Sequence, residues 1–415
     1  MDLKYDVGIV GSGPAGFTAA LHFRKQGLSV VLFEKAEIGG VCLNRGCIPT
    51  KAILHSAELF EEIKTADTVG ITLSNVGVDF SKVMERKNQV VEKLRKSLAL
   101  TLKNSGTVTI NAEALILDKN HIEANGEIYE CSKIIVATGS TPRTFNGMEF
   151  DHKNILSSDD VLELTELPKS IVIVGSGAIG IEWARIFSAF DTEVTIIELA
   201  DKLLPIADIE VSKRIERIFK TKKIKIHKEV AVENIETSDK CIVHLNNGEI
   251  IEAEKVLVAV GRKATPIIRL EGIECIGDAC GEIQLAHFAS KQAIEIAEGI
   301  KFDKNLVPSV VYGNPEIAWI GKREQDLEHG SYQKSMLLIS TLGKSHCDNS
   351  TDGFIKVLFQ DNKIVGAHII SKEASSLIQQ ITIAIQNGIP VDKLKEVCFA
   401  HPTYSEGIFE TLFSY

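Results

Sequence analysis

The chain carries one pattern of hydrophobic and polar positions twice. Residues 7–35 read VGIVGSGPAGFTAALHFRKQGLSVVLFEK, and residues 171–199 read IVIVGSGAIGIEWARIFSAFDTEVTIIEL. Each stretch has an apolar run, a GxGxxG turn, a helical segment and a second apolar run that contains an acid near its end. We therefore predict two strand–turn–helix–strand units of the kind found in parallel α/β domains.

The glycines and the acid of each unit have the spacing of a dinucleotide-binding site. An offset of 164 residues carries one unit onto the other, matching Gly11, Gly13, Gly16 and Glu34 with Gly175, Gly177, Gly180 and Glu198. The first glycine turns the chain, the second admits a pyrophosphate to the backbone, and the third lets the helix pack on the strand. The helix N-terminus then faces the phosphates, and the acid can bind a ribose diol. A carboxylate at Glu198 would repel the 2′-phosphate of NADP, so NAD is favoured.

The segments between and after these units predict the remaining elements. Helices are expected at about 51–65, 80–104 and 374–387, and strands at 133–140, 255–262, 272–278, 353–357 and 366–370. The segments 133–140 and 255–262 are apolar strands that end in a glycine-containing turn, which is typical of the strand that closes a nucleotide-binding unit.

Two cysteines, Cys42 and Cys47, follow the first unit within the sequence GGVCLNRGCIPTK of residues 39–51. An ideal helix would hold residues five positions apart at roughly 8–9 Å, whereas a disulfide needs Cα atoms within about 7 Å. A bridge therefore requires a distorted turn, which Gly46 permits, and a strained bridge is easily reduced. The pattern favours a redox-active disulfide, with two ordinary reduced thiols as the alternative.

Composition narrows the possible partners. A chain of 415 residues with 44% apolar content can form two or three domains. The 46 basic and 56 acidic residues give a net charge of −10 without a basic block, so nucleic acid and anionic membranes are not expected as partners. We find no signal peptide and no apolar run of the roughly 18 residues that a transmembrane helix needs, and we expect a cytoplasmic protein that binds small molecules.

The other six cysteines show neither CxxC pairs nor a spacing suited to zinc. They lie at positions 131, 241, 275, 280, 347 and 398. We expect no metal site, and we expect these cysteines to be buried as small hydrophobic residues.

Taken together, these motifs resemble the flavoprotein disulfide reductases with two dinucleotide-binding folds, and among them most closely the dihydrolipoyl dehydrogenases. The resemblance rests on the GGxCLNxGCIPxK motif at residues 39–51, the two glycine fingerprints and the HPTxSE motif at residues 401–406, and it covers nearly the whole chain. It implies an α/β fold with two Rossmann-like domains, for FAD and NAD, and a C-terminal α+β dimerisation domain. The implied boundaries are 1–145 and 265–306 for the FAD domain, 146–264 for the NAD domain and 307–415 for the dimerisation domain.

The resemblance also implies roles for individual residues. Cys42 would exchange with the substrate and Cys47 would contact the flavin, while Lys51 would lie near the flavin and pair with Glu182. The implied FAD-binding residues are Gly11, Gly13, Gly16, Glu34, Lys51, Thr138, Gly139, Asp278 and Ala286. The implied NAD-binding residues are Gly175, Gly177, Gly180, Glu198 and Gly261.

The HPTxSE motif implies a homodimer. By this match His401 is the acid/base, oriented by Glu406, and acts on the disulfide of the partner subunit. Histidine suits this role because it titrates near neutral pH. The alternative for Thr403 and Glu406 is a capping box ahead of a C-terminal helix.

The implied activity is oxidation of dihydrolipoamide by NAD⁺, with lipoyl groups on an acyltransferase or carrier protein as partners. Two alternatives remain: a reductase of another small disulfide, of the glutathione or coenzyme A type, and a non-catalytic flavin-binding relative. The second arises because the family usually has several tens of residues more between Gly261 and Asp278. The ten residue-to-residue steps from Arg262 to Gly272 can still span at most about 33 Å, so the domains can be joined.

Two smaller departures from the family pattern have less weight. Phe399 stands where dihydrolipoyl dehydrogenases often have a second histidine, and we expect little effect because His401 is retained. The chain ends at Tyr415 without the cysteine pair of mercuric reductases, so mercury reduction is not expected.

Overall fold

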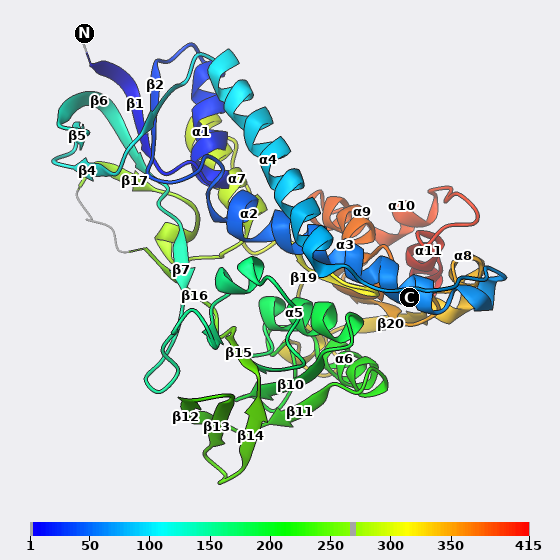
Figure 1. The fold of residues 1–415 in the computed structure, drawn as a ribbon. Coiled ribbons are helices and arrows are strands. Elements are labelled where there is room, and N and C mark those ends of the chain that lie inside the picture. Colours follow the sequence, from blue (N-terminus) through cyan, green and yellow to red (C-terminus); the bar gives the residue numbers. More distant parts are fainter. Residues whose placement is uncertain (1–2, 266–270, 415) are drawn as a thin grey trace.

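The computed structural model describes residues 3–265 and 271–414, which form three units (Figure 1). The first unit contains a sheet in the order β3-β2-β1-β6-β5-β4. Strand β17 pairs with the C-terminal part of β6, and β5 pairs with its N-terminal part. Its strands are β1 (Lys4–Val10), β2 (Val30–Glu34), β3 (Val108–Asn111), β4 (Ala114–Ile116), β5 (His121–Ala124), β6 (Glu127–Val136) and β17 (Ile273–Cys275). Strands β3, β2, β1, β6 and β17 pair in parallel, whereas β4 and β5 are antiparallel.

The helices of the first unit place the cysteine motif beside its sheet. They are α1 (Pro14–Lys25), α2 (Gly40–Arg45), α3 (Cys47–Lys64), α4 (Phe80–Asn104) and α7 (Ala286–Glu298), with η1 at Ala66–Val69 and η3 at Gly277–Cys280. Helix α1 packs against α7, although 260 residues separate their ends in sequence. The expected helices at 51–65 and 80–104 are thereby confirmed.

The second unit repeats the parallel arrangement. Its main sheet has the order β11-β10-β9-β15-β8, in which every pair is parallel. The elements are β8 (Ile155–Leu156), η2 (Asp160–Glu163), β9 (Ser170–Val174), α5 (Ala178–Ala189), β10 (Glu193–Glu198), α6 (Ile209–Thr221), β11 (Lys225–Lys228) and β15 (Lys255–Val258). A small antiparallel sheet adds β12 (Val232–Thr237), β13 (Cys241–Leu245) and β14 (Ile250–Ala253).

The third unit is an antiparallel sheet covered by helices. The strand order is β18-β19-β22-β21-β20, formed by β18 (Ser309–Val311), β19 (Glu316–Gly321), β20 (Gln333–Leu338), β21 (Phe354–Gln360) and β22 (Lys363–Ser371). The other elements are η4 (Glu324–Asp326), η5 (Ile339–Thr341), α8 (Gly343–Cys347), α9 (Ala374–Gln386), α10 (Val391–Lys395) and α11 (Glu406–Phe413). The predicted α/β class with a C-terminal α+β unit is confirmed.

Two short connections join the first and second units. Strand β16 (Arg262–Ala264) pairs antiparallel with β7 (Ser140–Pro142), so both crossings between the units run side by side. The predicted short crossing from Arg262 to Gly272 lies partly outside the described residues. On its far side the chain enters β17 and pairs with β6, which completes the first sheet.

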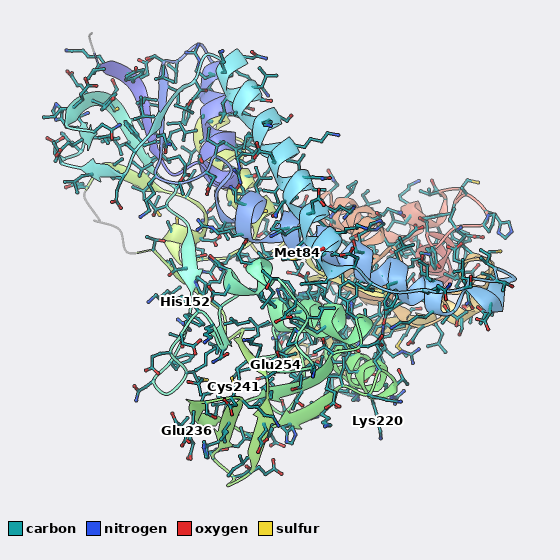
Figure 2. All side chains as sticks on the ribbon, viewed as in Figure 1. Met84, His152, Lys220, Glu236, Cys241 and Glu254 are labelled. Carbon is teal, nitrogen blue, oxygen red and sulfur yellow. The ribbon has the colours of Figure 1, made fainter. Side chains whose placement is uncertain are left out.

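The largest apolar cluster crosses between units and fixes their relative position. Met84 on α4 and Ile53 on α3 pack into one cluster with Ile181 and Phe187 of α5 and with Val311 of the third unit. Figure 2 shows Met84 where α4 approaches the second unit. Because burying such side chains stabilises the arrangement by about 25 cal/mol per Å² of apolar surface, the three units are held as one body around α3.

The prediction that the six other cysteines are all buried is only partly right. Cys131 and Cys241 are buried as expected, and burial raises the pKa of each to about 11. Cys275 and Cys280 are only half-buried, while Cys347 and Cys398 are exposed, so the expectation that all six are buried is wrong. The sequence pattern did not show that three of these cysteines end short elements near the surface and that Cys398 lies in the loop after α10. Among residues 3–265 and 271–414, no helix has the length and apolar character to cross a bilayer.

Candidate active site

The two cysteines of the GGVCLNRGCIPTK motif lie on separate helices. Cys42 belongs to α2 and Cys47 begins α3. The helical conformation is interrupted between them at Gly46, which has φ −146° and ψ −114°. A Cβ atom on residue 46 would lie 3.0 Å from the Val41 carbonyl oxygen and 3.2 Å from the Cys42 Cα. The distorted turn expected at Gly46 is therefore present, and glycine lets the two cysteines approach each other there.

Both thiols are free in this structure, and they interact with each other. The Cys42 thiol donates a hydrogen bond to Cys47 Sγ, which, followed by burial, raises the pKa of Cys42. The same hydrogen bond is the main reason that the pKa of Cys47 falls to about 7, with the Lys51 charge acting in the same direction against burial. At neutral pH the proton therefore stays on Cys42, and Cys47 carries the thiolate character.

Lys51 is held beside the thiols by an ion pair that joins the three units. Its Nζ lies 2.8 Å from both carboxylate oxygens of Glu182, on α5, and 4.6 Å from the ring centroid of Tyr312. The backbone N–H of Tyr312 donates to Glu182 Oε1 at 3.0 Å. Burial opposes the ammonium charge, but the charge and hydrogen bonds of Glu182 outweigh it and raise the pKa of Lys51. The positive charge near Cys47 is thus permanent at physiological pH.

The first glycine fingerprint has the geometry that its spacing predicts. Gly11 has φ +100°, and a Cβ on Gly16 would lie 1.8 Å from the Gly11 carbonyl oxygen, so a turn and a close approach both require glycine. Glu34 at the end of β2 accepts hydrogen bonds from the Ser12 N–H at 3.0 Å and from its hydroxyl at 2.6 Å. The acid and the glycine turn are therefore locked together at the carboxyl edge of the sheet, where dinucleotides bind in such folds.

The second fingerprint repeats this network. Glu198 accepts from the Ser176 N–H at 2.8 Å and from its hydroxyl at 2.5 Å, and a Cβ on Gly180 would lie 2.0 Å from the Gly175 carbonyl oxygen. Gly177 has open space around it, and Gly261 has φ +100° after β15. The two serines were missed as functional candidates, although their recurrence at the 164-residue offset was visible in the sequence.

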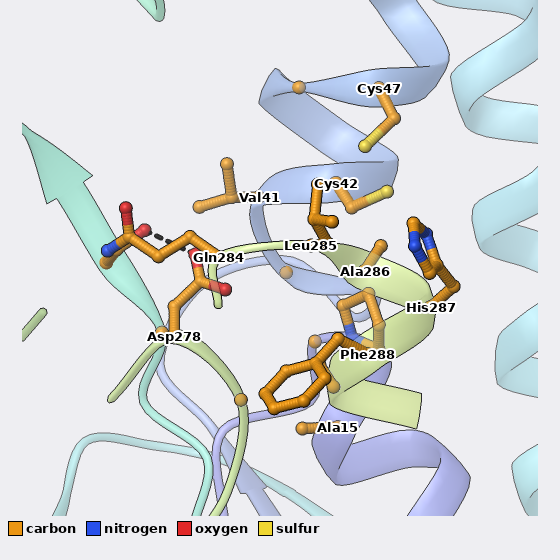
Figure 3. Close-up of a pocket in the computed structure, with 18 of the residues that line it drawn as sticks. Ala15, Val41, Cys42, Cys47, Asp278, Gln284, Leu285, Ala286, His287 and Phe288 are labelled. Atoms are coloured by element: carbon orange, nitrogen blue, oxygen red, sulfur yellow. Dashed lines mark hydrogen bonds between the residues drawn. The ribbon is translucent and has the colours of Figure 1, made fainter. Parts of the chain in front are cut away.

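A cavity of about 1590 Å³ is lined by Cys42, Cys47, Lys51 and Glu182 together with the predicted FAD residues of the first unit except Gly16. Such a volume exceeds the roughly 300–1,000 Å³ of ordinary ligand pockets and suits an extended dinucleotide. Figure 3 shows Cys42 and Cys47 above Leu285 and Ala286, with Asp278 on the other side of the cavity. The predicted NAD residues of the second unit do not line it, but Ala178 and Ile179 at the start of α5 do.

The polar groups in this cavity fit FAD. The buried Thr138 hydroxyl has no hydrogen-bond partner within the described structure. Asp278 accepts one bond from the Ser140 hydroxyl at 2.6 Å, which leaves carboxylate lone pairs for a ligand. Helix α7 begins at Ala286 without a side-chain cap, so the N–H groups of its first turn are available at the cavity wall. These groups could bind phosphate and ribitol oxygens.

His401 and Glu406 form a separate pair in the third unit. His401 Nδ1 lies 2.7 Å from Glu406 Oε1, and the Thr403 N–H donates to Glu406 Oε2 at 2.8 Å. The Thr403 hydroxyl instead donates to the Ala400 carbonyl, and α11 begins at Glu406 after Ser405, so only half of the alternative capping box forms. His401 is exposed, and neither member of the pair is among the described residues that line the cavity.

The fold and site define a class of protein. Residues 5–290 match the family model for pyridine nucleotide-disulphide oxidoreductases, and residues 307–412 match the dimerisation domain of that family. The chain therefore belongs to the pyridine nucleotide-disulphide oxidoreductase family, and it is an oxidoreductase with FAD and NAD(H) as cofactors. The dimerisation domain supports a homodimer.

The chain is also similar to individual proteins over nearly its whole length. The chain is 33% identical to a dihydrolipoyl dehydrogenase of Chlorobaculum tepidum, over 99% of this chain and 97% of the relative. It is also 33% identical to the dihydrolipoyl dehydrogenase of Bacillus subtilis, over 99% and 98%. The crystal structure of LpdA from Mycobacterium tuberculosis has the same fold, with a TM-score of 0.91, 23% identity and coverage of 98% of this chain and 99% of that chain.

Proposed function

We propose that this chain oxidises dihydrolipoyl groups to lipoyl groups with NAD⁺, using Cys42 and Cys47 as the redox pair. The observation that supports it most is the placement of Cys47, with its pKa of about 7, beside Lys51 in a dinucleotide-sized cavity. The substrate class follows from the full-length similarity to proteins named dihydrolipoyl dehydrogenase. Lipoyl groups carried by an acyltransferase or carrier protein are the proposed partners, and the proposed location is the cytoplasm.

The proposed reaction starts from the Cys42–Cys47 disulfide. His401 of the partner subunit takes a proton from one substrate thiol, and the resulting thiolate attacks Cys42 Sγ, so that Cys47 leaves as a thiolate stabilised by Lys51. The second substrate thiol attacks the mixed disulfide at the substrate sulfur, and Cys42 leaves and takes up a proton. The substrate has then lost two electrons and two protons, and the protein holds the reduced pair seen in this structure.

We propose that the cofactor-binding residues have the roles expected from the sequence. Gly11, Gly13, Gly16, Glu34, Thr138, Gly139, Asp278 and Ala286 would hold FAD with Lys51, and Gly175, Gly177, Gly180, Glu198 and Gly261 would hold NAD. When bound, these cofactors supply the electron transfer from the dithiol to NAD⁺. The chain contributes position and charge, because Lys51 stabilises the thiolate that must face the flavin.

The test is NADH formation from dihydrolipoamide by the purified FAD-loaded protein. Cys47→Ser should lower the rate by at least about a thousandfold, because the reactive sulfur is lost. Cys347→Ser, at an exposed cysteine on α8, should leave it unchanged. NAD⁺ should be preferred to NADP⁺, since Glu198 is an acid at the ribose position.

Two outcomes would contradict the proposal. Full activity of Cys47→Ser would show that the pair is not the redox centre. Inactivity toward dihydrolipoamide, with turnover of glutathione disulfide or a coenzyme A disulfide, would assign the same site to a reductase of another small disulfide.

A further inference from the structure

A second pair of cysteines repeats the spacing of the first. Cys275 ends strand β17 and Cys280 ends η3, five positions later, and their Sγ atoms lie 3.0 Å apart. A disulfide has an S–S separation of about 2.05 Å, so the two atoms need to approach by about 1 Å. Both side chains are half-buried, so small reagents can reach them.

The hydrogen bond between the two thiols gives them different roles. Cys280 donates to Cys275 Sγ, and this bond is the main reason that the pKa of Cys280 rises, with burial second. Because Cys275 Sγ is the acceptor of this bond, we take Cys275 as the sulfur that attacks first. The first pair shows the same division, with Cys42 as the donor and Cys47 as the acceptor.

The segment enclosed by the second pair carries a predicted FAD residue. Asp278 lies within it, lines the cavity and accepts from the Ser140 hydroxyl at 2.6 Å. The preceding Gly277, with φ +69°, donates its N–H to Gln292 Oε1 on α7 at 2.8 Å. The position of the Asp278 carboxylate in Figure 3 therefore depends on the short turn that connects the two cysteines.

We propose that Cys275 and Cys280 form a second redox-active pair, which small-molecule disulfides oxidise to a reversible bridge that fixes the turn carrying Asp278. The Cys275 thiolate attacks one sulfur of the small disulfide, forms a mixed disulfide and releases one small thiolate. The Cys280 thiol then passes its proton to the released small thiolate, and its sulfur attacks Cys275 Sγ and releases the second small thiolate. Two protein thiols are oxidised, one small disulfide is reduced to two thiols, and the released thiolates take up the two protons that the cysteines lose.

The Cys275–Cys280 bridge would restrict the turn that carries Asp278 both without FAD and with FAD in the cavity. A covalent loop across Ile276–Ala279 lowers the number of conformations open to Asp278 and so favours the arrangement that binds FAD. We expect the oxidised pair to slow FAD release by at least about threefold. The bridge itself does not depend on the proposed reaction with dihydrolipoyl groups.

Thiol mapping tests the pair directly. The FAD-loaded protein is incubated with glutathione disulfide, trapped with N-ethylmaleimide and digested with trypsin. The peptide that holds Cys275 and Cys280 should be unalkylated and lighter by two hydrogen atoms, and a dithiol reductant should reverse this. Exposed Cys347 and Cys398 should form only glutathione adducts, and buried Cys131 and Cys241 should remain unmodified by glutathione.

Variants separate the bridge from its effect on FAD. In Cys280→Ser the reaction with glutathione disulfide should stop at a glutathione adduct on Cys275, because the second thiol is missing. In a Cys42→Ser/Cys47→Ser background, flavin fluorescence should show slower FAD release after oxidation, and Cys275→Ser/Cys280→Ser should abolish that response.

Failure of the unsubstituted protein to form the bridge would overturn the proposal. A bridge that leaves FAD release unchanged would overturn its link to Asp278. Either result is distinguishable from failure of the proposed function, because neither measurement involves turnover of dihydrolipoamide.

Discussion

At the level of single residues, Cys47 and Lys51 show how a half-buried thiol can be reactive. Burial by itself disfavours a thiolate, as Cys131 and Cys241 show with their raised pKa values. Cys47 is an exception because it accepts a hydrogen bond from Cys42 and lies near the Lys51 ammonium. At Cys47 the hydrogen bond from Cys42, together with the smaller effect of the Lys51 charge, therefore outweighs burial.

This comparison predicts the effect of removing the charge. Lys51→Met should raise the pKa of Cys47 above about 7 and lower its alkylation rate at pH 7 by about five- to tenfold. The rate of iodoacetamide reaction at Cys47, followed by mass spectrometry from pH 5 to pH 10, gives the midpoint. Lys64→Met is the matched control, because Lys64 lies on the same helix but pairs with Asp191 at 2.7 Å. An unchanged midpoint in Lys51→Met would contradict the assignment.

At the level of elements, the N-terminus of α6 is tied to the third unit by buried charges. Asp208 caps α6 by accepting from the Glu210 N–H at 3.0 Å, and Lys356 on β21 donates to the same carboxylate at 2.7 Å. Lys356 also contacts Glu324 at 2.5 Å, and both Lys356 and Asp208 are almost fully buried. The Lys356 ammonium group therefore joins the carboxylate that caps α6 to the third unit.

Removing that ammonium should destabilise the protein strongly. Lys356→Met leaves Asp208 buried beside Glu324 without its cation, and we expect a loss of about 3–5 kcal/mol in the free energy of unfolding. Lys344→Met removes a partly exposed pair between Lys344 on α8 and Asp348, which directly follows that helix, and should have a much smaller effect. Urea unfolding followed by circular dichroism measures the free energy of unfolding of both variants. Equal losses would show that the buried network stabilises the protein no more than the exposed pair does.

At the level of the whole molecule, the proposed site is divided between two places in one chain. The cavity with Cys42 and Cys47 lies where the three units meet, whereas His401 lies outside it on the third unit. Residues 307–412 match a dimerisation domain. A second copy of the chain could therefore bring the histidine of one subunit to the cysteines of the other.

Mixed dimers test this arrangement. His401→Gln should lower the dihydrolipoamide rate by about 10²–10⁴-fold, because the acid/base is lost. After unfolding and refolding of a one-to-one mixture with Cys47→Ser, about a quarter of the unsubstituted activity should return, because half of the dimers are mixed and each has one intact site. No recovery, with mixed dimers verified by mass spectrometry, would place the whole site within one chain.

Much of this architecture could be predicted from the sequence because its determinants are local. The GxGxxG turns, the acids at the ends of the second strands and the break between helices at Gly46 follow from steric and hydrogen-bonding needs within about 30 residues. The same holds for helices α3, α4 and α9, which lie close to the predicted ranges. Local patterns of this kind therefore indicated two nucleotide-binding units and a cysteine pair.

Contacts between distant residues could not be obtained in this way. The sequence does not show that Tyr312 closes the Lys51–Glu182 pair or that Lys356 neutralises Asp208. Each of these contacts depends on how β18 and β21 are placed by the packing of whole units. Burial and local charge set the pKa of a side chain, and both are properties of the folded chain. The motifs thus specified which chemical groups are present, whereas only tertiary packing decided which of them interact and which cysteines remain accessible.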